Sequence, residues 1–594
     1  MSDRILYYTQ RVEKLREQQS VIDKKLRQIS NIRVILFLAI VGSVALAIIY
    51  TYGILWATVA LVIAFGVQVK LYAIESKEAE ICHAILTLNS NELEFAKGDK
   101  SIFPHGDITG ATGHIYAVDL DIFGKGSLFQ AVDRAGTWEG KGLVADALLA
   151  LPKDLSVIER QKAATIELAE DVEWRQRLHV IGTMAGETPA DMPSLRQWID
   201  QPEFYATRSS WIWIARGISL LSVSFIAWMF YVQAFYPFYF FGWLTFNLAI
   251  RGMLEKEIKK YFSSFGFRTK LFRKFADLFL LVSKRSFTSP LCNEHHEKIG
   301  EAHTAFLELS QLSNRAEQRL NGLVGPLMNG LFLFDIWNID AIERWRLKHK
   351  DHVDGWIIAL ANLDMLSSLA NYRFNHPGFT DAAVVAGPSF IKAHDMGHPL
   401  LPMDVSVKND YEIGVGSKAH IVTGSNMAGK STFIRAVGLN LVLAMNGLPV
   451  CAREFRCSVM SIASCIRITD SLEEHASYFR AELIRLEHIV SLLSTGEPYI
   501  VLLDEILRGT NSDDKRMGTL AFFRKLKDRD CLAILATHDL VIGKLEAEFP
   551  QHFSNYCFES ELRGPELYFD YKLRRGVSAS TNATFLMKSL GLID

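Results

Sequence analysis

The sequence predicts an α/β domain at the C-terminal end, an all-helical domain before it, and two helical hairpins long enough to cross a membrane. Three observations support this prediction. A glycine-bounded loop at 424–432 follows an apolar strand, and later apolar strands end in acidic or histidine residues. Helical apolar spacing fills residues 113–208 and 255–372. Two pairs of uncharged apolar runs lie within 34–69 and 218–250.

The loop fits the pattern G-x-x-x-x-G-K-[ST]. Its residues are Gly424, Ser425, Asn426, Met427, Ala428, Gly429, Lys430, Ser431 and Thr432. A strand is expected to end before it at 418–423, and a helix is expected to follow from residue 432. Glycines let backbone N–H groups surround phosphates, and a helix N-terminus favours negative charge. In this pattern Lys430 reaches the β- and γ-phosphates of a nucleotide, and the Ser431 hydroxyl ligates Mg²⁺.

Two downstream apolar runs are expected to complete this site. Residues 499–503 lead into Asp504 and Glu505, as in a buried parallel strand that delivers carboxylates at its C-terminal edge. Asp504 is expected to hold Mg²⁺ through water, and Glu505 to polarise the attacking water. Residues 531–537 form another apolar run that stops at His538, which is expected to orient near the γ-phosphate. Alone, such residues are more commonly a surface acid or a strand-end histidine, but behind a phosphate loop the catalytic interpretation is favoured.

The details of residues 395–594 resemble the ATPase domain of MutS proteins. The matching segments are Asn426-Met427, 504–514 (DEILRGTNSDD), Thr537-His538, His398-Pro399, Asn409-Asp410, and 569–573 with Gly576. Residues 477–482 (SYFRAE) resemble the family signature S-T-F-M-x-E. The resemblance implies a P-loop ATPase of the ABC/MutS type that uses ATP and Mg²⁺ as a homodimer. It also implies that Ser477 reaches the partner's nucleotide, and that DNA is the usual partner.

This sequence departs from the family pattern at several positions. Those positions are Ser425 and Ala428 in the loop, Leu507 and Lys515 after the acidic strand, and His475. The two loop residues are small and are expected to be tolerated. The other three replace glycines, and the glycine at 475 would permit close backbone approach. The contact of Ser477 across the dimer is therefore the least secure part of the expected site.

A second resemblance covers part of the helical region. Residues 114–161 are similar to the start of the MutS core domain, the helical lever that links DNA-binding parts to the ATPase. We expect no mismatch-reading domain, because Phe306-Leu307-Glu308 fits its F-x-E pattern only within a helical run, which favours a chance match. The second hairpin falls about where relatives carry their DNA clamp.

Composition limits the choice of partner and compartment. The chain has 64 basic and 66 acidic residues, so DNA binding would need a local basic patch. The mean hydropathy of +0.12 is high for a soluble ATPase. Cysteines lack any C-x-x-C pair, and Cys451, Cys457 and Cys465 are interpreted as buried thiols in a reducing compartment.

The excess apolarity lies in the two hairpins. Runs 34–50 and 54–69 form the first pair, and runs 218–233 and 236–250, turning near Pro237, form the second. The alternatives are a buried core hairpin or an amphipathic interface helix. All four flanks are basic, so the termini and the ATPase are expected in the cytoplasm of a multi-pass inner (cell) membrane protein with four membrane helices.

Two further expectations concern the segments around the first hairpin. Residues 6–32 are interpreted as a solvated helix and not as a coiled coil, and residues 72–112 as loop-rich. The expected domains are an N-terminal cytoplasmic helix (1–33), transmembrane hairpin 1 (34–71), a linker with the first part of the lever (72–210), transmembrane hairpin 2 (211–252), the second part of the lever (253–375) and the ATPase domain (376–594).

The preferred hypothesis is a membrane-anchored MutS-type ATPase that acts as a homodimer, with DNA as the default partner and a protein partner or lipid as the rival. One alternative is an ABC-type transporter half, against which stands the absence of an LSGGQ-type signature. Others are a membrane-protein remodelling ATPase without DNA binding, and a scaffold with a degenerate nucleotide site. The intact Lys430, Ser431, Asp504 and Glu505 argue against the scaffold.

Overall fold

A computed structural model describes residues 2–49, 55–106, 113–202, 210–233, 236–266, 268–425, 427–467, 478–563 and 566–578. The chain divides into two compact units. Unit 1 comprises Met1–Arg134, Val144–Val172 and Leu366–Asp594, and unit 2 comprises Ala135–Leu143 and Glu173–Met365. Helices α4 (Trp138–Leu149) and α15 (Phe334–Asn375) run across the boundaries.

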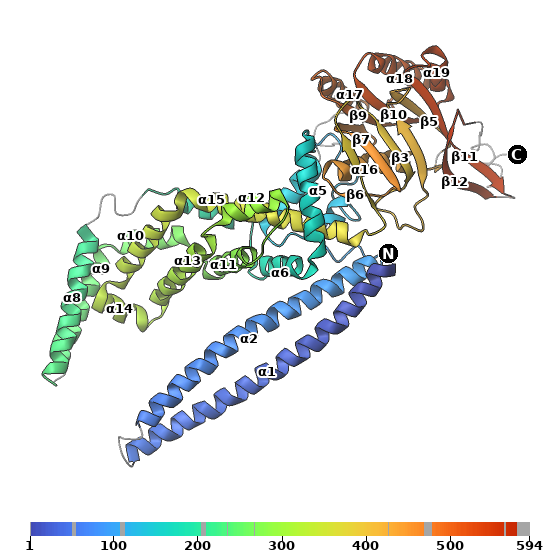
Figure 1. Cartoon of the computed structure of the whole chain (residues 1–594). Helices are drawn as coiled ribbons and strands as arrows, with labels where there is room; N and C mark the ends of the chain where they lie inside the picture. Colours follow the sequence, from blue (N-terminus) through green and yellow to red (C-terminus); the bar gives the residue numbers. More distant parts are fainter. Residues whose placement is uncertain are drawn as a thin grey trace. The chain divides into compact units, whose positions relative to one another are not determined.

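Unit 1 begins with a long antiparallel hairpin of α1 (Ser2–Ile49) and α2 (Leu55–Ala96), which lie side by side (Figure 1). Positions 8, 12, 15, 19, 22, 26 and 29 of α1 follow the heptad spacing of four and three, and four of them (Tyr8, Val12, Leu15 and Ile29) are buried. The polar member, Gln19, pairs with His83 of α2 at 3.2 Å.

Two expectations about this region were wrong. Residues 6–32 are not a solvated single helix, because their heptad positions pack on α2; Gln19 interrupts the apolar pattern that would have revealed the seam. Residues 72–96 are not loop-rich, because α2 continues to Ala96. The side chains of α2 that face inward, among them Ile81, Cys82, Ile85 and Leu88, are buried, as a paired helix requires.

The half of the hairpin near its turn exposes apolar side chains on its outer faces. Examples are Phe37, Leu38, Trp56, Val62 and Ile63. Between the two helices, the Ser43 and Thr58 hydroxyls hydrogen-bond at 3.0 Å. In this half of the hairpin a buried hydroxyl pair thus lies between the helices while large apolar side chains are exposed, which is unlike a helix pair in water.

Among the described residues, four helices have the length and composition needed to span a membrane: Asp3–Ala47, Trp56–Ala96, Ser210–Tyr231 and Phe334–Asn375. The last was not expected, and its apolar window is 72% buried, so burial in the protein explains its composition. In the second expected hairpin, Ser210–Tyr231 is followed by α9 (Pro237–Met253). This helix has 17 residues and is about 25 Å long. That length is slightly short of the ~30 Å hydrocarbon core.

The C-terminal part of unit 1 is built on a six-stranded sheet of order β12-β11-β5-β10-β9-β8. Its strands are β5 (Ala419–Thr423), β8 (Ser461–Cys465), β9 (Tyr499–Asp504), β10 (Cys531–Thr537), β11 (Phe553–Arg563) and β12 (Glu566–Arg575). All neighbouring pairs are parallel except β11 with β12. Strands β5, β9 and β10 are buried at every position, which matches their continuous apolar sequences.

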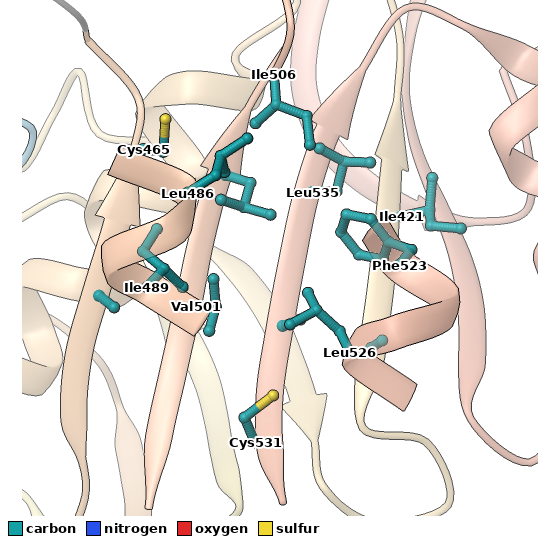
Figure 2. Close-up of a cluster of buried hydrophobic side chains, with 14 of the residues drawn as sticks. Ile421, Cys465, Leu486, Ile489, Val501, Ile506, Phe523, Leu526, Cys531 and Leu535 are labelled. Carbon is teal, nitrogen blue, oxygen red and sulfur yellow. The ribbon is translucent and has the colours of Figure 1, made fainter. Parts of the chain in front are cut away.

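Helices cover this sheet. Those of the domain are α16 (Lys430–Met445), α17 (Tyr478–Leu493), α18 (Ser512–Lys527), the 3₁₀ turn η6 (Leu540–Gly543) and α19 (Lys544–Glu548). Figure 2 shows Leu486 and Ile489 of α17 and Phe523 and Leu526 of α18 over Val501 and other strand residues, in one buried cluster. Parallel strands with a covered face carry their loops, and hence any site, at the strand ends.

Smaller elements complete unit 1. A second sheet of order β2-β7-β3-β4 comprises β2 (Ala383–Val385), β7 (Glu454–Ser458), β3 (Ile391–Met396) and β4 (Asn409–Ile413), and β1 (Thr380–Asp381) pairs with β6 (Pro449–Val450). Helices α3 (Leu128–Val132) and α5 (Leu155–Glu170) are capped by Ser127 and Asp154, whose side chains accept backbone N–H groups of the first turns.

Unit 2 is helical. Its further helices are α6 (Val172–Thr183), α7 (Asp191–Ile199), α8 (Ser210–Tyr231), α9, α10 (Glu255–Phe265), α11 (Thr269–Ser283), α12 (Pro290–Ile299), α13 (Ala302–Glu317), η4 (Gln318–Leu320) and α14 (Val324–Phe332). Phe306 of α13 is fully buried among Phe275, Phe279 and Trp345. A core position explains this residue, in agreement with a chance match to F-x-E.

Candidate nucleotide-binding site

The glycine-bounded loop joins β5 to α16, as the sequence predicts. Gly424 has φ 153° and Gly429 has φ 101°, and Gly429 is the N-cap of α16, which begins at Lys430. A Cβ at residue 424 would lie 2.7 Å from the Phe558 carbonyl oxygen, so glycine is needed there. Asn426 lies outside the described residues. The loop therefore points its backbone and the N-terminus of α16 into one space.

Lys430 and Ser431 lie at the start of α16. The Lys430 ammonium donates to the carbonyl oxygens of Gly424 (2.7 Å) and Ser425 (2.8 Å), and burial lowers its pKa. The Ser431 hydroxyl donates to the Asp504 carboxylate, which ends β9. A hydroxyl and a carboxylate in direct contact are hard oxygen donors of the kind that Mg²⁺ prefers, so this pair fits the expected metal ligands.

Glu505 and His538 also come together. The Glu505 carboxylate lies 3.2 Å from His538 Nδ1 and 3.5 Å from Arg508 Nε. Burial alone would raise the pKa of Glu505, but the hydrogen bond with His538 and the charge of Arg508 outweigh it and lower the pKa. Asp504 differs, because burial raises its pKa despite the hydrogen bond from Ser431.

Lys430, Ser431 and Glu505 line a cavity of about 410 Å³. Its lining includes residues 427–433 of the loop and α16, Glu505, His398, Leu401, Val405, Asn409, Phe558 and Tyr571. The cavity thus runs from the acidic strand end across the loop to a more apolar side. Desolvation lowers the pKa of His398 to about 4, so its ring is neutral at pH 7.

Strained backbone occurs at and beside this site. Of the eight described non-glycine residues with φ between 49° and 70°, four are Met427, Glu505, Leu507 and Tyr571. Such conformations cost of order 1–3 kcal/mol and persist where the surroundings enforce them, which is common at functional sites. Leu507, which stands where the resemblance predicts glycine, keeps the left-handed conformation (φ 62°) and is buried.

Glu482 has a role that sequence reasoning missed. It belongs to the segment 477–482, but the pattern assigned it no contact. Its carboxylate accepts the backbone N–H groups of Leu507 (2.5 Å) and Arg508 (3.1 Å), and burial raises its pKa. Glu482 therefore shapes the turn that follows Glu505. The acid in the S-T-F-M-x-E-like pattern was the available signal.

Asn409 is a second residue without an assigned role. Its side chain donates to the Tyr571 carbonyl oxygen (3.0 Å) and accepts from the Leu573 backbone N–H (2.8 Å). It therefore ties β12 to the cavity wall. Ser477 and His475 lie outside the described residues, so the contact expected of Ser477 stays a prediction.

The cysteine expectation was correct about burial. Cys451, Cys457 and Cys465 are buried free thiols, and burial raises the pKa of the latter two to about 12. A thiol of such high pKa is a poor nucleophile and a poor metal ligand at neutral pH.

Comparisons with known proteins agree with this geometry. The family model described as MutS domain V matches residues 420–588. The chain is 30% identical over 254 residues to the DNA mismatch repair protein MutS of Thermotoga petrophila, covering 42% of this chain and 31% of that protein. It is 29% identical over 229 residues to the DNA mismatch repair protein MSH3 of Vanderwaltozyma polyspora, covering 37% and 22%. To the probable DNA mismatch repair protein Msh6 of Drosophila melanogaster it is 31% identical over 207 residues, covering 34% and 17%.

A parallel α/β sheet with this loop and these strand-end acids, in a segment that matches MutS domain V, defines the C-terminal region as a MutS-type domain. This domain is the part of the chain that matches the MutS family. The matched stretch spans about a third of the length of these relatives or less.

Proposed function

We propose that this protein is a membrane-anchored P-loop ATPase. One observation carries the proposal: Lys430, Ser431 and Glu505 line the same cavity, where Ser431 contacts Asp504 and Glu505 contacts His538. The first pair suits a metal–phosphate group, and the second suits a water held against it. The match of residues 420–588 to the family model of MutS domain V supports the same conclusion.

In this proposal ATP binds with its phosphates over residues 424–432. Lys430 supplies positive charge to the β- and γ-phosphates, and the N-terminus of α16 adds its dipole. Ser431 and Asp504 would hold Mg²⁺, which would neutralise phosphate charge there. Glu505 accepts a proton from the attacking water, for which its lowered pKa keeps it ionised, and His538 orients its carboxylate.

Assembly and location are further parts of the proposal. Two chains form a homodimer in which Ser477 completes the partner's site, as the resemblance implies. The hairpin α1–α2 and the hairpin α8–α9 insert into the cell membrane from the cytoplasm, which leaves the ATPase with its ATP supply. The exposed apolar faces of α1, α2 and α8 support insertion.

The object that the ATPase moves is proposed by analogy. The relatives are named DNA mismatch repair proteins, so DNA is the first candidate partner. A membrane protein or lipid is the second, favoured by the membrane hairpins. Crosslinking of the Glu505→Gln protein in the presence of ATP, scored for bound nucleic acid and bound protein, distinguishes the two candidates. Recovery of a protein without nucleic acid would exclude DNA as the partner.

The ATPase proposal is tested with Glu505→Gln and Lys430→Ala. Glu505→Gln should bind ATP but hydrolyse it at least ~10²-fold more slowly, because a general base is lost. Lys430→Ala should lose ATP binding. Glu487→Gln, an exposed change on α17, is the matched control and should keep normal turnover. Near-normal turnover by Glu505→Gln would show that water activation is misassigned.

A further inference from the structure

Helix α14 of unit 2 has an unusual surface. Residues 320–334 (LNGLVGPLMNGLFLF) carry no charged group, and the charged residues Arg319 and Asp335 flank them. On one side, Gly325, Asn329, Gly330 and Leu331 are buried. On the other, Leu323 is 84% and Leu320 67% exposed, with Leu327 also exposed. Water-facing helices seldom present leucines in this way without a partner.

The buried side of α14 packs on the α8–α9 hairpin. At the C-terminal end of α14, three carbonyl groups accept side-chain donors from that hairpin. Asn247 donates to the Gly330 carbonyl oxygen (2.7 Å), Ser222 to that of Leu331, and Ser219 to that of Phe332 (3.2 Å). A Cβ at Gly330 would lie 2.7 Å from Leu244 of α9, so the helices are in close contact there.

These bonds suit an apolar medium. The last carbonyl groups of a helix lack intrahelical partners, and in lipid each unsatisfied group costs several kcal/mol. Here the chain breaks at Leu333, which has φ 52° and is fully buried. Ser222 and Asn247 are also fully buried, so the hairpin hides its polar groups against α14.

A charged layer marks where this apolar region ends. Asp335, fully buried just after the break, pairs with Arg251 at 3.0 Å and with Arg319 at 3.3 Å. Arg251 lies near the end of α9, and Arg319 precedes α14. Long basic side chains at this position are typical of the membrane interface.

We propose that α14 and the preceding turn are a third membrane element, which inserts the side chains of Leu320, Leu323 and Leu327 into the bilayer beside α8–α9. The inference rests on the proposed insertion of α8–α9. At nine residues, α14 is about 14 Å long, too short to span and suited to the interfacial region. The apolar surface of α8, where Leu220, Leu221 and Val223 are exposed, supplies the continuous lipid-facing neighbour.

The test uses spin labels on the full-length protein in lipid nanodiscs. The seven native cysteines are buried, so a cysteine introduced at an exposed position can be labelled selectively. The variants are Leu323→Cys on the turn, Phe230→Cys on α8 and Ile358→Cys on α15; all three residues are exposed. Accessibility to oxygen, which concentrates in lipid, is compared with accessibility to a water-soluble nickel chelate.

Labels at residues 323 and 230 should be more accessible to oxygen than to the chelate, and the label at residue 358 should be more accessible to the chelate. A label at 323 that favours the chelate while 230 favours oxygen would overturn the inference and leave the proposed hairpin intact. Shielding of residue 323 from both reagents would assign the leucines to a protein partner instead. A chelate-favouring label at 230 would reject the insertion of α8–α9 itself.

A charge substitution gives an independent measurement. In this measurement residues 34–69 are replaced by a short glycine-serine linker, which removes the first hairpin. In that background Leu323→Glu should increase the fraction of the protein that alkaline carbonate releases from the membrane. Ile358→Glu in the same background should not. Equal release of the two variants would argue against lipid contact at Leu323.

Discussion

Asp504 and Glu505 are adjacent in the chain, yet their pKa values shift in opposite directions. Burial dominates for Asp504 and raises its pKa, whereas His538 and Arg508 lower that of Glu505. The lowered pKa means that the Glu505 carboxylate is protonated at a lower pH than an ordinary glutamate. The proposed base is therefore lost to acid later than an ordinary glutamate would be. The two acids differ through their neighbours and not through residue type.

Glu482 offers a test of how the turn after Glu505 is held. In Glu482→Gln an amide NH₂ replaces one carboxylate oxygen, so one of the two N–H groups of Leu507 and Arg508 loses its acceptor. We expect turnover to fall about tenfold, equivalent to ~1.4 kcal/mol, within the ~1–3 kcal/mol cost of an unsatisfied buried group. ATP affinity should change little, since Glu482 makes no hydrogen bond to the loop. Single-turnover hydrolysis and nucleotide titration measure the two, with Glu487→Gln as control; an equal loss of affinity would contradict the assignment.

His420 predicts a dependence of stability on pH. It lies on β5, where Ser417 and Tyr411 contact its ring nitrogens at 2.9 Å, and desolvation lowers its pKa to about 3. Between pH 6.5 and 3 the unfolded chain binds a proton that the native state does not. The free energy of unfolding should therefore fall as pH falls, by up to ~1.4 kcal/mol per pH unit for one histidine.

Pulse proteolysis in urea at pH 7 and pH 5 measures this loss. His420→Gln should show a smaller loss than the unsubstituted protein, whereas His488→Gln, exposed on α17, should not. Burial lowers the pKa values of His376 and His398 to about 4, so these two residues should cause part of the loss of unfolding free energy that remains in His420→Gln. Identical pH dependence in all three proteins would contradict a neutral buried His420.

At the scale of elements, continuous apolar runs were the most reliable guide. The predicted strands at 418–423, 499–504 and 531–537 correspond to β5, β9 and β10. Strands buried on both faces have such runs, and their ends are marked by Gly424, Glu505 and His538. The α1–α2 seam was missed because its heptads mix Tyr8 and Gln19 with aliphatic residues. Whether such positions are buried is decided by partners far along the chain, such as His83, which lies 64 residues after Gln19.

The two hairpins can be separated by deletion. Residues 34–69 are replaced by a short glycine-serine linker, because Arg33 stacks over Tyr72 at 4.6 Å and the remaining helix ends lie side by side. The shortened protein should still resist carbonate extraction in part, through α8–α9. Complete solubility, with ATP binding retained, would identify α8–α9 as a hairpin buried in protein.

At the scale of the whole molecule, the proposal divides the site between two chains. The cavity of one chain holds loop residues and Glu505, while Ser477 would come from the partner. A lone domain should then hydrolyse slowly. The activity should rise with protein concentration or with density in the membrane, since chain association would complete each site.

Mixing two inactive proteins tests this arrangement. In a dimer of a Lys430→Ala chain with a Ser477→Ala chain, one site carries both lesions and the other carries neither. Partial recovery of turnover is therefore expected, measured as ATP hydrolysis by the mixture against each protein alone. No recovery in a mixture shown to contain heterodimers would mean that Ser477 acts within its own chain or not at all.

The sequence alone determined the loop, the strands that lead to Asp504, Glu505 and His538, and the apolar runs of the hairpins. These features are local, because phosphate binding and lipid burial each require particular residues at short spacing. Only the tertiary structure placed Glu482 under the turn at Leu507, Asn409 against β12, and α14 on α8–α9. Those contacts join residues far apart in the chain, and their energy depends on burial and hydrogen bonding that no local pattern records.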